Sequence, residues 1–512
     1  MSDLSRIVAI LLAAIPFGAI PVAAHAQTAP PEQPTGAAPE ARTTSPQEGA
    51  TTADPALGGR GEAPSGRDAA GAFSPGNAAA PAAAQSATAG PIARWQTANP
   101  LGKALRDLKA DGVAITANYV GNFAANPVGG VRQGTAESHW FDAGVELDLD
   151  KLLGLSGATL HIQGAAFGGT SLASTSIGNS ISFQQTWRPV PGPRLTQFNI
   201  DKDFFGKKLN IMVGRAALNS YFAASPLNCV FMSNTSCLTA YGPITAIGIT
   251  AFPNSSWAAK AKWAFSKKVY AQVGVFDYDN TLNLHGKGGL DLSLFKGTGI
   301  LTAAETGYET TFANDSRPRR YRAGVYINTD GGTNPLYDNS GNSSVLSGLV
   351  RHQQGGARVG VYAIGDQTVS RPDPRSQRNL AVFGRVFYNV GQPGPIDWFA
   401  SGGFVKTGTF AGRDNDTLGV LVTNTHFSRD EVTYLRQLRA KAGGSGTAPR
   451  NEIIGEFNYG FAAMPGVRLL PNVQYVINPD PINATSFKRD IPSAIVVGLR
   501  VDIRLAQLLT GG

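Results

Sequence analysis

The chain has 512 residues, 61 of them glycine, with a formal net charge of +8 and only 16% charged residues. Soluble domains average about 25% charged residues and about 7% glycine, so this composition departs from theirs on both counts. The low charge argues against a salt-bridged cytosolic enzyme, and the near-neutral mean hydropathy argues against a helical membrane protein. A large glycine-rich β protein remains, or a globule diluted by low-complexity sequence.

The N-terminus has the layout of a secretory signal peptide. Residues 1–6 end in a cation, residues 7–24 form an apolar run, and Ala24-His25-Ala26 matches a small-x-small cleavage site. A membrane anchor is the alternative, but proline and glycine interrupt the run, and a spanning helix needs about 20 unbroken apolar residues. We therefore predict a cleaved signal peptide over residues 1–26 and an exported protein.

The segment that follows, residues 27–93, contains little to bury. It consists mainly of Ala, Pro, Gly, Thr and Ser, and its only large apolar side chains are Leu57, Phe73 and Ile92. Such a segment cannot offset the entropy cost of ordering, so we predict a disordered tether. This tether is either a spacer that spans the cell wall or a disordered leader without a specific partner. Its three arginines and six acidic residues, with a neutral signal peptide, leave +11 on residues 94–512.

We predict that residues 94–512 form one barrel domain that begins with a short helix. Apolar residues at helical spacing predict this helix over about residues 96–110, on the periplasmic side. After it the period changes to two. In residues 493–505 apolar side chains alternate with Arg500, Asp502 and Arg504. A strand buried on both faces could not hold these charges, so one face contacts hydrocarbon or a core and the other contacts water.

Segments with this alternation recur along the chain. We predict sixteen strands, and a segment near Ile244 would add a seventeenth. They begin near residues 113, 140, 158, 195, 208, 257, 269, 304, 320, 357, 380, 397, 417, 452, 467 and 493. The connections alternate between short and long, which is typical of an outer-membrane barrel with short turns on one rim and long loops on the other. The connection over residues 390–397 breaks the rule, because it is short where a long one is expected.

The sequence therefore predicts an all-β fold, a sixteen-stranded antiparallel transmembrane β-barrel with a disordered N-terminal extension. A soluble β-sandwich would also alternate, but its inner face would be dry and its outer face polar. Here the polar face is rich in charge and the apolar face is rich in Trp, Tyr and Phe. This distribution favours the barrel.

No pattern of catalytic or cofactor-binding residues stands out. The histidines beyond the signal peptide lack metal-ligand spacing, and the sequence has neither a G-x-S-x-G elbow nor a phosphate-binding glycine loop. Lysine and arginine are spread along the chain, so nucleic acid is not an expected partner. We predict no enzymatic activity, no cofactor and no metal.

The two cysteines, Cys229 and Cys237, both fall in the longest predicted loop. In an exported protein such a pair is predicted to form a disulfide. It would close a loop of about nine residues and contribute about 2–3 kcal/mol through chain entropy. Two free thiols are the alternative. If this loop folds into the barrel, the bridge would stiffen whatever restricts the pore.

The inner face of the barrel is where solutes would pass. Sixteen strands leave an aqueous lumen, whereas eight are filled by side chains. Inward charges of both signs would set a transverse field at a constriction and would hydrogen-bond hydroxyl-rich solutes. Inward aromatic residues would stack on sugar faces or serve ordinary packing in the lumen. The candidates are Tyr270, Phe276, Tyr326 and Tyr362.

Short sequence blocks distributed over about residues 96–505 form a recognisable set. The most specific are EFNY at residues 456–459, NVQYVINP at residues 472–479 and VGLR at residues 497–500. In these blocks the sequence resembles the OprB-type carbohydrate-selective porins of Gram-negative outer membranes. The resemblance implies a sixteen-stranded barrel, passive sugar uptake and a narrow eyelet lined by arginine and acidic residues. One departure is Gln197, in a strand where the family usually carries acidic residues.

The eyelet candidates come from two sources. The matching blocks of the resemblance contribute Arg215, Glu305, Asp366, Arg413 and Glu456, and the alternation of the last strands contributes Arg468, Arg500, Asp502 and Arg504.

We predict a porin of the Gram-negative outer membrane that lets mono- and oligosaccharides and similar polyhydroxy solutes diffuse passively into the periplasm. A general or anion-preferring porin is the alternative, because residues 94–512 carry +11. A barrel lipid hydrolase or a structural cell-wall-binding protein is less favoured. The expected partners are sugar or polyol solutes and outer-membrane lipid and lipopolysaccharide, with the tether as a candidate contact to peptidoglycan.

Overall fold

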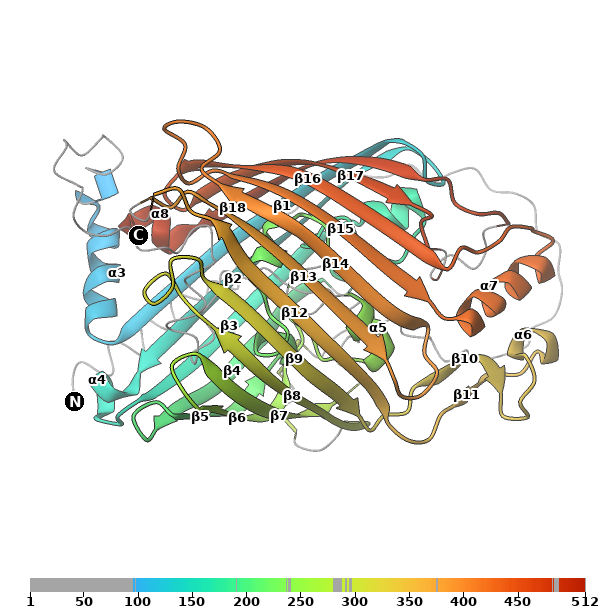
Figure 1. Ribbon diagram of the computed structural model, residues 1–512, viewed down its shortest axis with the longest axis horizontal. Helices are drawn as coiled ribbons and strands as arrows, with labels where there is room; N and C mark the ends of the chain where they lie inside the picture. Colours follow the sequence, from blue (N-terminus) through green and yellow to red (C-terminus); the bar gives the residue numbers. More distant parts are fainter. Residues whose placement is uncertain are drawn as a thin grey trace. The chain divides into compact units, whose positions relative to one another are not determined.

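The computed structural model describes residues 95–96, 98–189, 191–235, 237, 241–279, 288–290, 292–293, 297–373, 376–480, 482 and 488–511. The predicted signal peptide and tether lie outside the described residues. Sixteen strands form one closed antiparallel barrel, in which β1 pairs with both β2 and β18 (Figure 1). They are β1 (Val113–Val128), β2 (Gly134–Asp148), β3 (Ala158–Gly169), β4 (Gly192–Phe204), β5 (Leu209–Ala216), β6 (Ser256–Ala264), β7 (Val269–Tyr278), β8 (Gly299–Glu309), β9 (Arg319–Asn328), β12 (Arg358–Ser370), β13 (Asn379–Asn389), β14 (Ile396–Thr407), β15 (Thr417–Phe427), β16 (Asn451–Met464), β17 (Val467–Ile477) and β18 (Ala494–Arg504).

The predicted fold class is confirmed. Two strands begin earlier than their alternating cores suggest, β2 at Gly134 and β8 at Gly299, because pairing continues past the alternating stretch. The seventeenth segment near Ile244 is not a strand but helix α5 (Tyr241–Ile247). Pro243 lies in its first turn, where a helix needs no amide donor, so the local sequence suits a helix start.

The outer wall of the barrel is apolar. On β18 the side chains of Val497 and Leu499 are 41% and 39% exposed, whereas Arg500 is buried on the inner side. Phe141 on β2 and Phe457 on β16 are exposed in the same way. An apolar outer band of this kind faces lipid in outer-membrane barrels.

The short turns gather at one end of the barrel with α3 (Pro100–Ala110), α4 (Leu149–Leu153) and α8 (Leu505–Thr510) (Figure 1). We call this end the short-turn rim. Asn99 caps α3 by accepting hydrogen bonds from the amides of Leu101 and Gly102 (3.0 and 3.4 Å). Gly102 permits close packing on α8, because a Cβ there would lie 2.2 Å from the carbonyl oxygen of Leu509.

Longer connections lie at the opposite end of the barrel, with the exception of the short one between β13 and β14. They include β10 (Thr333–Asp338), β11 (Arg351–Gln353), α6 (Ser344–Ser347) and α7 (Arg429–Lys441). Arg351 connects β11 to α7, because its guanidinium pairs with Glu431 (3.8 Å) and lies over the ring of Tyr434 (4.5 Å). Among the helices of the described residues, none has the length and apolar character needed to cross a membrane.

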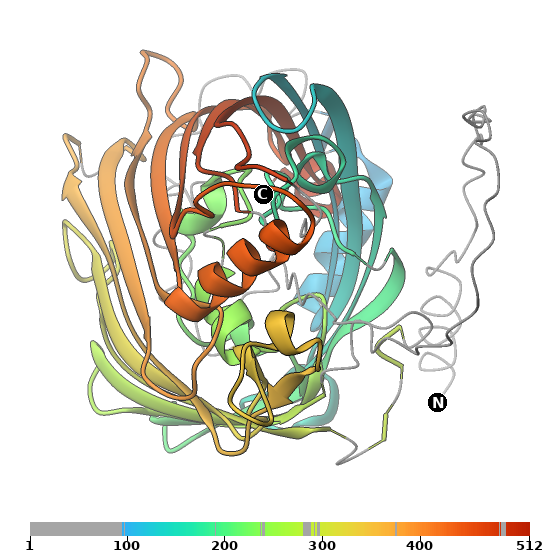
Figure 2. The same ribbon diagram turned by 90° about the vertical axis from the view of Figure 1, so that its right-hand side faces the viewer.

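Two long loops turn into the barrel, residues 170–191 and 217–255. Figure 2 shows the green segments of the second loop inside the ring of strands. The loops contain the π-helical turn η3 (Ala173–Ile177), the 3₁₀ turns η4 (Leu218–Ser220) and η5 (Leu227–Val230), and α5. Between the loops and the inner wall lies a buried apolar core that includes Leu172, Phe183, Phe222, Ile244, Phe276, Tyr326 and Phe399. The expectation of a wet inner face therefore fails at the level of these loops, because apolar wall residues pack against them.

Candidate functional site inside the barrel

The loop over residues 217–255 contains no Asp, Glu, Lys, Arg or His, and we call it the neutral loop. Its described residues are buried, apart from Ser220, Ala224 and Thr245, which are half-buried. Buried main-chain amides and carbonyls require hydrogen-bond partners. Many of these partners are charged or amide side chains of the barrel wall.

Three wall carboxylates hold the neutral loop. Glu305 on β8 accepts a hydrogen bond from the amide of Ala223 (2.8 Å), and Asp366 on β12 accepts one from the hydroxyl of Ser225 (2.7 Å). Glu456 on β16 accepts hydrogen bonds from two successive amides, those of Met232 and Ser233 (2.8 and 2.7 Å). Hydrogen bonds that involve a charged group are stronger than neutral ones. These carboxylates therefore fix the path of the loop.

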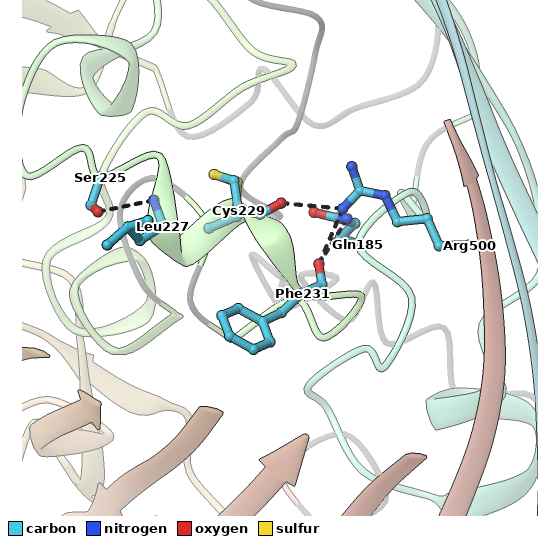
Figure 3. The surroundings of a disulfide bond; sticks show 7 residues. Gln185, Ser225, Leu227, Cys229, Phe231 and Arg500 are labelled. Atoms are coloured by element: carbon cyan, nitrogen blue, oxygen red, sulfur yellow. Dashed lines mark hydrogen bonds between the residues drawn. A yellow bond between two sulfur atoms is a disulfide. The ribbon is translucent and has the colours of Figure 1, made fainter. Parts of the chain in front are cut away.

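Donors on the wall bind the carbonyl groups of the same stretch. The guanidinium of Arg500 on β18 donates to the carbonyl oxygens of Cys229 and Phe231 (3.3 and 3.2 Å), as Figure 3 shows. The side-chain amide of Asn458 donates to the carbonyl oxygen of Val230 (3.1 Å). Amides and carbonyls of one short segment are thus bound from β16 and β18 together.

A disulfide joins Cys229 to Cys237 inside this segment. Both cysteines are buried. The bridge closes a small ring that begins within η5, at the place where Arg500 and Glu456 bind. The same part of the neutral loop is therefore fixed by a covalent bond and by hydrogen bonds to the wall.

The other inward loop, residues 170–191, packs directly on the neutral loop. The main-chain amide of Gln185 donates to the carbonyl oxygen of Met232 (3.0 Å), and the amide of Asn234 donates to the carbonyl oxygen of Ser182 (3.2 Å). The side-chain amide of Gln185 donates to the carbonyl oxygen of Phe231 (2.9 Å). The two loops therefore form one hydrogen-bonded unit.

The structure brings most of the predicted eyelet residues to the inner wall, although five of them bind the neutral loop. Glu305, Asp366, Glu456 and Arg500 are buried and bind that loop. Arg215 is also buried and donates to the carbonyl oxygen of Ser255, at the end of the loop.

Three further candidates lie closer to the short-turn rim. Arg468 on β17 is paired in register with Asp502 on β18, and Arg504 ends the same strand. Arg468 donates to the hydroxyl of Thr417 (2.9 Å), and Asp502 accepts from Arg500 (2.7 Å). These residues continue the charged inner face below the loops.

Arg413 is separated from the other candidates. It lies in the turn between β14 and β15, where its guanidinium pairs with Asp416 (2.7 Å) and lies over the ring of Phe461 (4.1 Å). Burial opposes ionisation of Asp416, but hydrogen bonds from Arg413, Tyr459 and the amide of Ala462 outweigh it and lower the pKa of Asp416. Arg413 therefore stabilises a turn at the short-turn rim and does not join the inner-wall set.

The inward aromatic residues pack within the protein. Tyr326 and Tyr362 stack on each other with centroids 4.6 Å apart. The hydroxyls of Tyr270 and Tyr362 donate to Glu305 (2.8 and 2.9 Å), and Phe276 lies edge-on to Phe222. These residues support the neutral loop instead of presenting free rings to a solute. Gln197, the departure from the family pattern, is half-buried and donates to Asn199 (3.3 Å).

Three inner-wall arginines were missed by the sequence reasoning. Arg322 on β9 pairs with Glu309 and donates to the carbonyl oxygen of Ala224, and Arg320 lies 3.9 Å from Asp366. Arg385 on β13 is the third, and it is buried. Each stands at an alternate position of a predicted strand, and that alternation is the signal that could have found them.

Among the described residues, no group of three or more His, Cys, Asp or Glu is arranged to hold a metal ion.

A closed barrel of sixteen antiparallel strands, with an apolar outer wall and loops folded into a charged lumen, is the architecture of an outer-membrane porin. The family model of the carbohydrate-selective porins, OprB family, matches residues 132–505, and the chain belongs to this family. The resemblance found in the sequence blocks is thereby confirmed. The protein is a sugar porin of the Gram-negative outer membrane, and proteins of its family are channels rather than enzymes.

Individual relatives agree with this assignment. The chain is 24% identical to Porin B of Pseudomonas aeruginosa over 423 residues, which cover 80% of this chain and 90% of that protein. It is 22% identical to the putative porin QuiX of Acinetobacter baylyi over 420 residues, which cover 78% and 90%. The high-pH structure of Pseudomonas putida OprB superposes with a TM-score of 0.71 at 25% identity, covering 79% of this chain and 97% of that one.

Proposed function

We propose that the passage for solutes is bordered by the neutral loop and by residues 170–191, and that it admits neutral polyhydroxy solutes in preference to ions. The observation that carries the proposal is that the loop nearest the buried wall charges has no charged side chain of its own. Glu305, Glu456 and Arg500 are engaged with that loop's backbone. Their charges hold the constriction in place and are not free to attract ions.

The preference follows from desolvation. An ion that enters a narrow passage lined by neutral groups loses hydration that uncharged dipoles replace only in part. A sugar exchanges hydrogen bonds with water for hydrogen bonds with hydroxyls, amides and main-chain groups, at little net cost. Mono- and oligosaccharides of suitable width therefore diffuse down their gradient, and no bond is made or broken.

An anion-preferring channel is the second candidate. Residues 94–512 carry +11, and Arg320, Arg322 and Arg385 lie on the inner wall. These guanidiniums are buried or nearly so, and Arg322 pairs with Glu309, which favours the neutral-solute reading. The barrel lipid hydrolase and the structural cell-wall-binding protein stay less favoured, since the family consists of channels.

The domain assignments belong to the same proposal. Residues 1–26 are removed on export, and residues 27–93 tether the barrel toward peptidoglycan. The apolar outer wall contacts phospholipid in the inner leaflet and lipopolysaccharide in the outer leaflet. Arg468, Asp502 and Arg504 border the passage below the loops, where they meet solutes that have passed the constriction.

Single-channel recording in planar bilayers tests the proposal. We expect added maltose or glucose to reduce the current, and the reversal potential in a KCl gradient to stay near zero. Glu456→Gln places a side-chain N–H against a buried amide, which costs about 1–3 kcal/mol, so the loop loosens, conductance rises and sugar block weakens.

Arg413→Gln is the matched control, because Arg413 lies in a turn at the short-turn rim. Its sugar block and conductance should equal those of the unmodified protein. Strong chloride selectivity without sugar block would instead establish the anion-preferring channel. Equal effects of the two substitutions on sugar block would remove the neutral loop from the passage.

A further inference from the structure

Two neighbouring turns on the short-turn rim are rich in lysine. The β4–β5 turn contains Lys207 and Lys208, the β6–β7 turn contains Lys267 and Lys268, and all four lysines are exposed. The strands β5 and β6 are paired, and the amide of Ala264 donates to the carbonyl oxygen of Lys208 (2.7 Å). The two turns therefore lie side by side. We call the four residues the lysine rim.

Exposed aromatic rings lie next to the lysine rim. The ring of Phe205 lies 6.4 Å from those of Phe204 and Trp263, and Phe205 and Phe265 are 71% and 65% exposed. The ammonium of Lys202 lies 5.5 Å from the ring centroid of Phe204. Aromatic rings, and lysines with apolar stems, gather at the head-group level of membranes.

The side-chain ammonium groups of the four lysines form no ion pair with the described residues. In the part of the chain that the structure describes, no carboxylate lies within ion-pair distance of any of them. Arginines of other turns on the same rim are paired, as Arg378 is with Asp414 (2.7 Å) and Arg413 is with Asp416 (2.7 Å). The positive charge of the lysine rim is thus available to an outside ligand, whereas that of the arginines is neutralised.

We propose that the lysine rim binds the phosphate groups of anionic phospholipids, with Phe205 and Phe265 inserted beside the glycerol and upper acyl chains. Short turns of outer-membrane barrels face the periplasm, so the rim lies at the head groups of the inner leaflet, which is built from phospholipid. Phosphatidylglycerol and cardiolipin share the anionic phosphodiester that ammonium groups attract. Each lysine near an anionic surface contributes about 1 kcal/mol, or about fivefold in affinity.

Native mass spectrometry of the full-length protein tests this assignment. The protein is released from nanodiscs of phosphatidylethanolamine with phosphatidylglycerol and cardiolipin, and retained lipids are counted. The rim variant is K207Q/K208Q/K267Q/K268Q. The matched control is K103Q/K109Q/K441Q/K488Q, which removes the same charge from four other exposed lysines. We expect the rim variant to retain at least about tenfold less anionic lipid, and the control to retain as much as the unmodified protein.

Each outcome decides the assignment. Equal retention by all three proteins, or equal loss in both variants, would overturn it, since the second result reflects net charge alone. Sedimentation with purified peptidoglycan sacculi is measured in parallel. If the rim variant loses sacculus binding while its lipid retention is unchanged, the rim belongs to the cell wall and the lipid assignment is overturned. Sugar block should be normal in both variants, which separates this test from that of the channel and shows that the barrel has folded.

Discussion

Four donors meet the carboxylate of Glu305. One oxygen accepts from the hydroxyl of Tyr270 and the side-chain amide of Gln272 (2.8 Å each), and the other accepts from the amide of Ala223 (2.8 Å) and the hydroxyl of Tyr362 (2.9 Å). Glutamine cannot satisfy this set, because in either orientation its N–H group faces a nitrogen donor. We expect Glu305→Gln to cost about 1–3 kcal/mol and to raise single-channel conductance as the start of the neutral loop loosens.

Tyr362→Phe provides the graded control for this residue. It removes one of the four donors and keeps the stacked ring, so it should cost about 1 kcal/mol and leave conductance nearly unchanged. The heat-unfolding midpoint in detergent orders the proteins as unmodified, Tyr362→Phe and Glu305→Gln. A Glu305→Gln protein with normal conductance would show that this carboxylate does not hold the constriction.

Asp490 is a second residue whose charge orders a loop. Burial of its carboxyl opposes ionisation. Hydrogen bonds from the Arg439 guanidinium, from the amide and hydroxyl of Thr447 and from the amide of Ala448 outweigh burial and lower the pKa of Asp490 to about 2. Because the folded pKa is depressed, the contribution to stability is complete above the unfolded pKa of about 4 and is lost as the pH falls through about 2. Pepsin cleaves beside large apolar residues, so its cleavage at Leu438, next to this loop, should rise over this interval.

The variant Asp490→Asn tests the charge directly. It should be cleaved by pepsin already at pH about 4, where the unmodified loop is still ordered by the ionised carboxylate. Asp414→Asn, in a turn at the other end of the barrel, should leave pepsin cleavage at Leu438 unchanged. Equal pepsin sensitivity of Asp490→Asn and the unmodified protein across the interval would contradict the role given to Asp490.

At the scale of single residues, the sequence predicted which face of the barrel a side chain lies on better than it predicted the groups that the side chain binds. The period of two assigned Arg500 and Glu456 to the inner face, where they lie. It could not show that their partners are main-chain groups of Cys229 and Ser233, which are more than two hundred positions away in the chain and carry no side-chain pattern that marks them. Arg413 shows the opposite error, because a matching sequence block identified a turn residue as a wall residue.

The disulfide acts on one element, the segment of the neutral loop from Cys229 to Cys237. We expect Cys229→Ser with Cys237→Ser to keep the barrel folded, because the barrel strands are joined by their own ladders. The freed segment loses a constraint of about 2–3 kcal/mol, so open-channel noise should increase. Reduction of the unmodified protein with dithiothreitol should give the same noise, and the double variant should no longer respond to the reductant. Unchanged noise in both experiments would show that Arg500 and Glu456 fix the segment without the bridge.

Strands could be predicted as elements, but the course of the long loops could not. Successive side chains of a strand point to opposite faces, so the inner and outer residues of β18 can be assigned from the local sequence alone. The inward turn of residues 217–255 depends on long-range packing, in which Phe222 and Ile244 enter a core with wall residues such as Phe399. The same packing explains why the segment near Ile244 is a helix, since it lies inside the barrel and pairs with no strand.

At the scale of the whole molecule, the barrel closes within residues 113–504. The closing ladder joins β1 to β18 from Asn118↔Arg504 to Val128↔Ile495, and every other barrel strand pairs with its two neighbours. The described ladders of the barrel run between residues 113 and 504. Folding of the barrel and passage of sugar should therefore not depend on residues 27–93.

Deletion of residues 27–93 behind an intact signal peptide tests this independence. We expect the same conductance and the same sugar block, because the strands, both inward loops and their wall contacts all lie beyond residue 112. If the tether reaches peptidoglycan, sedimentation with purified sacculi should be lost at the same time.

A Gly/Ser segment of equal length in place of residues 27–93 is the matched control, because it restores the length of the N-terminal segment without its native composition. Recovery of sacculus binding in that control would show that the contact needs a segment of this length but not its native composition, whereas continued loss would assign the contact to the native tether sequence. A deletion that abolishes the folded barrel would contradict the independence that the closed ladder implies.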